Sequence, residues 1–280
     1  EYNANENPDR QLEQIRDCIA QGVDGIIIIP QDGDSAVTII NEAQAADTPI
    51  AVFNRPPNDR SRGITVVADN VSATEQAVEF IAQKALTKFE TTGEPIIPLI
   101  VVGALQDTNA IGRREGFFNV INRYNEKYPG MFNTPIEVAS EWDAATALAN
   151  LESAITANPG VDFLYTSSDF LFPTIRSVLE PRGMWVTRGT AGHVLMAGLD
   201  GDATACKLIE EGYVDATGVQ NLFFEAELTM NRLLEAIENG ETQPNEVLLD
   251  PGFALTSANF PWQAMDMWGC VLYYEGFLDQ

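Results

Sequence analysis

Residues 7–30 have the sequence NPDRQLEQIRDCIAQGVDGIIIIP and contain one complete helix–strand unit. Asn7 is suited to cap a helix, Pro8 to its first turn and Gly22 to its end. The strand that follows, Gly25–Ile29, has four consecutive isoleucines and no polar alternation, so we expect both of its faces to be covered. A helix followed by such a strand is typical of a parallel sheet between two layers of helices.

The same alternation of apolar runs and helical periodicity continues along the chain, without low-complexity stretches or short repeats, and it predicts an α/β fold. Further strands are expected at Pro49–Phe53, Ile64–Val67, Ile97–Val102, Ile136–Ala139, Phe163–Thr166, Val194–Ala197 and Val214–Val219. Further helices are expected at Ser35–Ala45, Ser72–Phe89, Asn109–Tyr124, Ala144–Ala157, Phe170–Leu179, Ala203–Glu211 and Leu222–Asn239. The stretch 259–280 is rich in aromatic residues but has no clear period, so we expect a tail packed on the body.

The composition disfavours several classes of partner. There are 16 Lys and Arg against 41 Asp and Glu, which gives a formal net charge of −25 over 280 residues, 45% of them apolar. A chain this apolar can bury a core, so the acidity is a surface property. We expect no nucleic-acid partner, because phosphate contacts need clustered basic residues. The longest apolar run, Ile26–Ile29, is far too short for membrane insertion. The length suits two lobes of about 120–150 residues each.

Catalytic and metal-binding chemistry lacks its usual residues. His193 is the only histidine and lies at the start of a predicted strand, so a multi-histidine metal site and a Ser-His-Asp triad both lack their parts. None of the nucleophile-elbow, P-loop, zincin or dinucleotide-binding motifs occurs. We therefore expect no enzyme activity, no metal and no cofactor. Cys18, Cys206 and Cys270 are odd in number and far apart, which favours buried free thiols over one remote disulfide.

Polar side chains follow the predicted strands at their carboxyl ends, where open α/β sheets bind ligands. These residues are Asn54, Arg55, Asp107, Asn109, Arg113, Glu141, Trp142, Asp143, Ser167, Ser168, Asp169, Asp200 and Gln220. The set suits a neutral polyhydroxylated ligand: guanidinium and carboxylate groups bond strongly to hydroxyls, amides donate and accept, and an indole covers the C–H face of a pyranose.

Each of these residues also has a purely structural interpretation. The two arginines, Arg55 and Arg113, equally suit surface salt bridges, and a Trp after a strand, such as Trp142, is more often a core residue than a sugar platform. Asp169 and Asp200 equally suit the N-caps of helices. The gathering of polar groups at one end of successive strands favours the binding interpretation, whereas no single residue does.

Seven motifs, in order over residues 3–250, resemble the periplasmic sugar-binding proteins of the ribose/galactose type, which are substrate-binding components of ABC transporters. Four resemble the first lobe of that family and three the second. They are Asn5-Glu6-Asn7-Pro8-Asp9-Arg10-Gln11, Gln21-Gly22-Val23-Asp24-Gly25 with Ile26–Pro30, Thr48–Arg55, Val67–Asn70, Asn109–Phe117, Ala197–Gly201 and Gly212–Thr217.

The resemblance implies the type I periplasmic binding protein fold, in which two Rossmann-like lobes with parallel sheets are joined by a three-segment hinge. The first lobe would comprise residues 1–68 and 221–249, and the second residues 69–220 and 250–258, with 259–280 as the tail. The family's opening strand and helix have no counterpart in this sequence.

The resemblance also assigns ligand contacts by position. Asn54 and Arg55 match the residues of the first lobe that bind sugar hydroxyls. Arg113 matches the family's sugar-binding arginine, Asn109 its polar partner, and Trp142 the aromatic residue that stacks on the sugar ring.

Further contacts come from the second lobe and the hinge. Asp200 matches the carboxylate of the second lobe, and Gln220 matches the amide at a hinge crossing. Ser168 stands where the family more often has Asn, and it is followed by Asp169 of the common Asn-Asp pair.

The function implied is non-enzymatic: a monomeric solute-binding protein captures a pentose or hexose between its lobes by hinge closure and delivers it to a membrane ABC permease. Its expected location is the periplasm or the cell exterior, with tethering to the cell surface as one option. The alternatives are the effector domain of a LacI-type repressor, which shares the fold, and a receptor for a sugar or an autoinducer-2-like signal.

Overall fold

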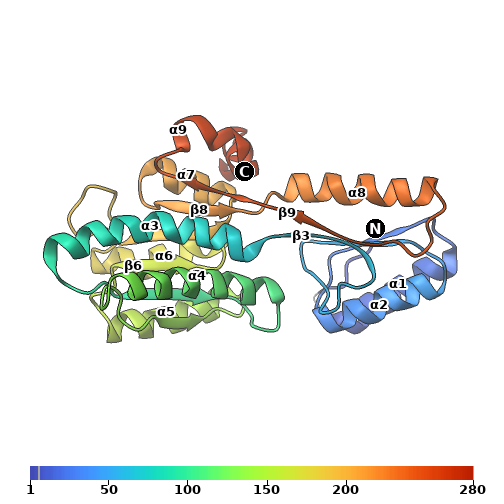
Figure 1. Cartoon of the computed structure of the whole chain (residues 1–280), viewed down its shortest axis with the longest axis horizontal. Helices are drawn as coiled ribbons and strands as arrows, with labels where there is room; N and C mark the ends of the chain where they lie inside the picture. The colour runs from blue at the N-terminus through green and yellow to red at the C-terminus, as the bar shows by residue number, and fades with distance from the viewer. Residues whose placement is uncertain (6, 280) are drawn as a thin grey trace. The chain divides into compact units, whose positions relative to one another are not determined.

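The computed structural model describes residues 1–5 and 7–279 (Figure 1). Residues 6 and 280, which fall in the predicted first lobe and tail, lie outside the described residues. The chain forms two compact units. Unit 1 contains Glu1–Asp69, Gln106–Asn109 and Leu222–Asp250, and unit 2 contains Asn70–Leu105, Ala110–Asn221 and the chain from Pro251.

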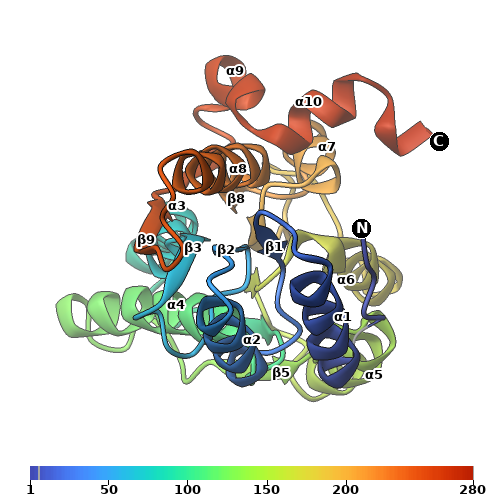
Figure 2. The same ribbon diagram turned by 90° about the vertical axis from the view of Figure 1, so that its right-hand side faces the viewer.

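Unit 1 is built on a parallel sheet. Its strands are, in spatial order, β1 (Ile26–Ile28), β2 (Ile50–Phe53), β3 (Gly63–Ala68) and β9 (Asn245–Asp250). Helices α1 (Pro8–Gln21) and α2 (Gly33–Ala45) pack side by side (Figure 2). Isoleucines from both helices and from β1 and β2 form one buried cluster. Helix α8 (Leu222–Glu238) contributes to a second buried cluster with β2 and β3. The sheet is covered on both faces, as the isoleucine run predicts, but the last isoleucine, Ile29, lies beyond β1 and is exposed.

Helix α1 begins and ends where its sequence predicts. The side chain of Asn7 accepts a hydrogen bond from Arg10 N at 2.9 Å, and Pro8 occupies the first turn. Gly22 ends the helix in the left-handed region, with φ of 68°.

Strand β1 pairs only with β2 among the described strands. Beyond its other edge lies a cavity of about 870 Å³, lined by the first four residues, one face of α1 and residues 26–29. The buried Gln11 side chain donates to Ile29 O at 2.9 Å and accepts from Gln31 N at 3.1 Å. A helix side chain therefore satisfies backbone groups just beyond the end of β1.

Unit 2 is built on a six-stranded sheet that is parallel except for its first strand. In spatial order the strands are β10 (Phe253–Thr256), β8 (Ala216–Val219), β7 (Leu195–Asp200), β6 (Phe163–Thr166), β4 (Pro98–Val102) and β5 (Ile136–Ala139).

Helices contribute to two separate buried clusters of this sheet. One cluster draws on α3 (Asn70–Thr92) and α4 (Thr108–Lys127), and the other on α5 (Ala144–Ala157), α6 (Phe172–Leu179) and α7 (Ala203–Glu211). Among the described residues, no helix is both long enough and apolar enough to cross a membrane.

The chain after α8 differs most from the expectations. Strands β9 and β10 were not predicted; β9 alternates exposed and half-buried residues, and Val247 and Leu249 on it are exposed. The stretch expected to be a tail packed on the body contains helices α9 (Phe260–Gln263) and α10 (Trp268–Tyr274), and α10 packs against α7.

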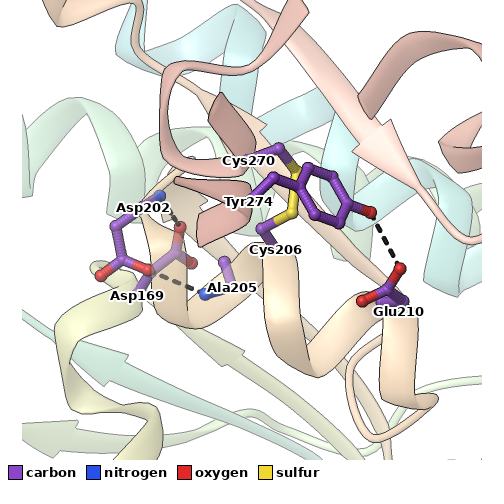
Figure 3. The surroundings of a disulfide bond; sticks show 7 residues. All are labelled: Asp169, Asp202, Ala205, Cys206, Glu210, Cys270 and Tyr274. Atoms are coloured by element: carbon purple, nitrogen blue, oxygen red, sulfur yellow. Dashed lines mark hydrogen bonds between the residues drawn. A yellow bond between two sulfur atoms is a disulfide. The ribbon is translucent and has the colours of Figure 1, made fainter. Parts of the chain in front are cut away.

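The expectation of free thiols is wrong for two of the three cysteines. Cys206 of α7 and Cys270 of α10 form a disulfide, with their Cα atoms 5.1 Å apart (Figure 3). The two residues are 64 positions apart in sequence and meet because α10 folds back onto α7. Cys18 is a free, half-buried thiol in α1.

Gly116 is predicted to be essential for the packing of α4 on α3. A Cβ atom there would lie 2.7 Å from Val71 O and 2.8 Å from the Cβ of Thr74. In an unobstructed helix, Gly→Ala stabilises by about 0.5–1 kcal/mol. Here we expect Gly116→Ala to destabilise by about 1–3 kcal/mol, because the two helices must move apart. Urea unfolding measures the difference.

The matched control is Glu115→Ala, an exposed neighbour on the same helix. It should change stability by less than about 0.5 kcal/mol. A Gly116→Ala protein as stable as the wild type would contradict the close contact between the helices.

Candidate functional site

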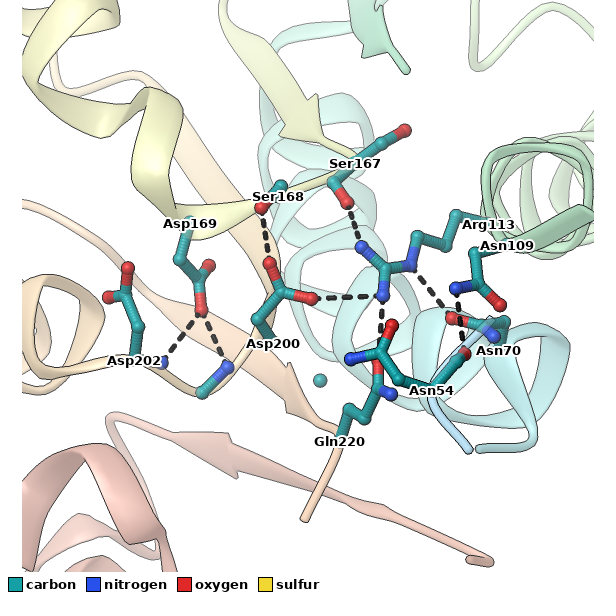
Figure 4. Close-up of polar contacts among 12 residues, drawn as sticks. Asn54, Asn70, Asn109, Arg113, Ser167, Ser168, Asp169, Asp200, Asp202 and Gln220 are labelled. Carbon is teal, nitrogen blue, oxygen red and sulfur yellow. Dashed lines mark hydrogen bonds and ion pairs between the residues drawn. The ribbon is translucent and has the colours of Figure 1, made fainter. Parts of the chain in front are cut away.

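Arg113 of α4 is the centre of a buried polar cluster in unit 2. Its side chain is 5% exposed and donates through Nε to Asn70 Oδ1 at 2.7 Å and through Nη1 to Ser167 O at 2.8 Å. Its Nη2 donates to Gln220 Oε1 at 2.8 Å and pairs with Asp200 Oδ1 at 2.9 Å (Figure 4). The four partners come from four separate parts of the chain, so together they fix the plane of the guanidinium group.

The parallel sheet brings these partners to one edge. Strands β6, β7 and β8 are neighbours in register, and their carboxyl ends lead into Ser168, Asp200 and Gln220 respectively. Ligands bind at this edge in open α/β sheets.

Asp200 combines an unusual backbone with a partly exposed carboxylate. Its φ of 120° is uncommon for a residue with a side chain, and 25% of the side chain is exposed. The hydroxyl of Ser168 donates to Oδ2, while Arg113 pairs with Oδ1. Burial raises the pKa of Asp200, and the Arg113 charge and the Ser168 hydrogen bond oppose that rise. Asp200 therefore has both a fixed orientation and contact with solvent.

Asp169 faces away from Arg113 and is fully buried. Its Oδ2 accepts from Gly201 N and from the hydroxyl of Thr217, both at 2.7 Å. Burial, followed by the charges of Asp202 and Asp200, raises the pKa of Asp169 well above its ordinary value. This placement favours a structural role, which is to hold the turn after β7.

The helix cap near this turn is Asp202, so the alternative of Asp200 as an N-cap is wrong. The Asp202 side chain accepts from Ala205 N at 2.8 Å and begins α7. Burial raises the pKa of Asp202 to about 6.

Trp142 lies beside Arg113, with the guanidinium carbon 5.7 Å from the centre of the indole ring. Its φ is 57°, in a left-handed turn after β5. The ring covers Gly103, where a Cβ atom would lie 2.2 Å from the indole. Trp142 is half-buried, so part of its surface is exposed.

Three further predicted residues belong to unit 1. Asn54 follows β2 with φ of 68°, and its backbone oxygen accepts from Asn109 Nδ2 at 3.0 Å. Arg55 Nε lies 3.7 Å from Asp107 Oδ2 in a partly exposed ion pair. Such a pair contributes little to stability, and it gives geometric support to the salt-bridge alternative for Arg55.

Asn70 was not among the polar residues singled out after the predicted strands; Ser167 was, but it contacts Arg113 through its backbone carbonyl. Asn70 comes two residues after the end of β3, so the rule of polar residues after strands would have found it. A backbone carbonyl such as that of Ser167 carries no side-chain signal. Within the part of the chain that the structure describes, no group of three or more metal-ligating side chains lies together.

The pKa of Asp202 predicts that stability depends on pH. An unfolded Asp titrates near about 3.9, so between about pH 4 and 6 the folded chain binds more protons. The stability linked to Asp202 is full below about pH 4 and is lost as the pH rises through 6. From pH 4.5 to 7.5 the wild type should lose on the order of 1–3 kcal/mol more stability than Asp202→Asn, whose amide still caps α7.

The matched control is Asp143→Asn. Asp143 also caps a helix, α5, but it is exposed, and its hydrogen bonds to Thr146 lower its pKa. The stability that Asp143 contributes should therefore be lost as the pH falls, which is the opposite pH dependence to that of Asp202. Urea unfolding at the two pH values measures both variants; equal pH dependence in the wild type and Asp202→Asn would contradict the account.

Several solved structures share the fold. A galactofuranose binding protein matches with a TM-score of 0.78 and 19% identity, covering 95% of this chain and 86% of that one. An ABC transporter solute binding protein from Bacillus halodurans with bound myo-inositol matches with a TM-score of 0.79 and 21% identity, covering 94% of this chain and 84% of that one. The predicted α/β fold with parallel sheets, of the periplasmic binding protein type, is confirmed.

Curated relatives match in sequence. The D-xylose-binding periplasmic protein of Haemophilus influenzae is 27% identical over 266 residues, which is 89% of this chain and 74% of the relative. The ribose import binding protein of Bacillus subtilis is 24% identical over 217 residues, covering 78% of this chain and 64% of the relative. The model of the periplasmic binding protein domain matches residues 1–242, so this chain belongs to the periplasmic binding protein family.

Proposed function

We propose that this protein binds a neutral monosaccharide, a pentose or a hexose, and delivers it to a membrane ABC permease. The observation that carries the proposal is the cluster of Arg113, Asp200 and Gln220 beside the Trp142 indole. The relatives named above bind xylose and ribose according to their names, and they are periplasmic or import binding proteins.

The charge of the cluster favours a neutral ligand. Arg113 and Asp200 neutralise each other at 2.9 Å, so no net positive charge is left for a phosphate or a sugar acid. The whole chain carries a formal net charge of −25, which disfavours anions further. Hydroxyl groups both donate and accept, so they suit a carboxylate beside a guanidinium and an amide.

The indole supports a sugar ring in particular. A partly exposed indole next to hydrogen-bonding groups suits a pyranose, which has an apolar C–H face and a polar rim. Because Gly103 leaves room beneath the ring, Trp142 can hold this position without displacing β4.

The division into two lobes with a three-segment hinge is part of the proposal. The chain passes between the two units after Asp69, after Asn221 and after Asp250, each within one residue of a predicted crossing, which supports these boundaries. Gln106–Asn109 groups with unit 1 although the prediction places it in the second lobe. In this proposal Asn54, Arg55 and Asn109 join the ligand contacts when the lobes close, and Ser168 contributes beside Asp200.

The rest of the proposal concerns location and assembly. We place the protein in the periplasm or at the cell exterior, as a monomer whose partner is the permease. The family supports a transport component and no enzyme. A repressor effector domain is not favoured, because the relatives named above are transport binding proteins.

Calorimetry on the full-length protein tests the function directly. The panel is D-xylose, D-ribose, L-arabinose, D-galactose and D-glucose, with D-ribose 5-phosphate as the anionic comparison. At least one neutral sugar should bind with a Kd of about 1 μM or tighter, near −8 kcal/mol. The phosphate ester should bind much more weakly. Failure of every neutral sugar would overturn the proposal.

Trp142→Ala should weaken binding of the best sugar by about tenfold, since an aromatic contact contributes about 0.5–1.5 kcal/mol beyond its buried area. Trp262→Ala is the matched control, because that side chain is 74% exposed on α9. Equal affinities of the two variants for the sugar would show that Trp142 does not contact the ligand.

A further inference from the structure

The C-terminal segment, defined here as residues 260–278, contacts the backbone of two candidate site residues. Trp268 Nε1 of α10 donates to Asp200 O at 3.1 Å and to Gln220 O at 2.9 Å. These carbonyls belong to the residues whose side chains meet Arg113. One indole N–H therefore links the ends of β7 and β8 from the side of the backbone.

The residue after Trp268 extends this contact. Gly269 N donates to Gly201 O at 3.1 Å, and a Cβ atom on Gly269 would lie 2.2 Å from that oxygen. Only glycine permits so close an approach. The fully buried Met267 packs on Gly201 from the same segment.

The disulfide fixes this contact covalently. Cys270, next to Gly269, is bonded to Cys206 in the first turns of α7, the helix that Asp202 caps (Figure 3). Farther along the two helices, the hydroxyl of Tyr274 donates to Glu210 Oε1 at 2.8 Å. The segment is thus attached beside the turn 200–202 and again at the other end of α7.

The turn itself needs such support. Asp200 has φ of 120°, a conformation that costs on the order of 1–3 kcal/mol and persists only where its surroundings impose it. Asp169 holds the turn through Gly201 N, and Trp268 and Gly269 hold it through the carbonyls of Asp200 and Gly201. Since the Asp200 backbone directs its carboxylate toward Arg113, contacts to that backbone also set the geometry of the candidate site.

We propose that Trp268 is a positioning residue for ligand binding, and that the Cys206–Cys270 disulfide keeps it in place. The part that concerns sugar affinity rests on the proposed function, whereas the part that concerns the turn does not. The C-terminal segment thereby sets the affinity of the site without touching the ligand, and opening the disulfide weakens binding.

The first test needs no ligand. Trp268→Phe keeps an aromatic side chain, though a smaller one, and removes the N–H donor, and Trp262→Phe makes the same change at the exposed tryptophan of the segment. Amide hydrogen exchange is followed at Gly201 and Gln220 in the full-length protein by NMR, with amides of α5 as an internal reference. Trp268→Phe should accelerate exchange at the two site amides by about tenfold or more, because the turn opens locally. Trp262→Phe should not.

Two results would overturn the positioning role. One is unchanged exchange at Gly201 and Gln220. The other is equal acceleration at these amides and in α5, since that pattern means a general loss of stability.

The second test uses the sugar of the calorimetric panel that the wild type binds most tightly. Trp268→Phe and the double variant Cys206→Ala/Cys270→Ala should each bind it about tenfold more weakly, while Trp262→Phe and Cys18→Ala bind it normally. Unchanged affinity together with faster exchange would overturn the link between the segment and the ligand. If the wild type binds no sugar, the proposed function fails, and the exchange experiment still decides whether Trp268 positions the turn.

Discussion

The ion pair between Arg113 and Asp200 is the interaction on which the candidate site depends. A buried guanidinium group is costly unless acceptors surround it, and removing one partner of such a pair typically costs about 3–5 kcal/mol. Here the acceptors come from the start of α3, the chain after β6, the end of β7 and the chain after β8. The requirement to satisfy one side chain therefore aligns the elements that surround the site and leaves part of Asp200 exposed to a ligand.

Three aspartates, Asp169, Asp200 and Asp202, lie close together beside this ion pair. Only Asp200 is paired with a cation in the described cluster, and burial raises the pKa values of Asp169, Asp200 and Asp202. Backbone N–H groups at the turn and at the start of α7 provide the remaining hydrogen bonds. The C-terminal segment donates hydrogen bonds to the carbonyls of this turn. The packing of that segment is therefore coupled to the position of the Asp200 carboxylate, which we propose contacts the ligand.

Much of this architecture could be predicted from local sequence, and the failures have physical reasons. Four isoleucines without alternation predict a sheet covered on both faces, and polar residues after strands lead to Arg113, Asp200 and Gln220. The disulfide could not be predicted, because it depends on α10 folding back onto α7. Trp268 escaped notice because its partners are backbone carbonyls. Strand β9 was missed because an exposed edge strand has a weak apolar pattern.

The central claim is that the Arg113 cluster and Trp142 hold a neutral sugar. A crystal structure of the full-length protein with the tightest-binding sugar of the calorimetric panel tests it most directly. The account predicts sugar hydroxyls within about 3 Å of Arg113, Asp200 or Gln220, and a C–H face of the ring on the Trp142 indole. Sugar density that contacts none of these four side chains would contradict it.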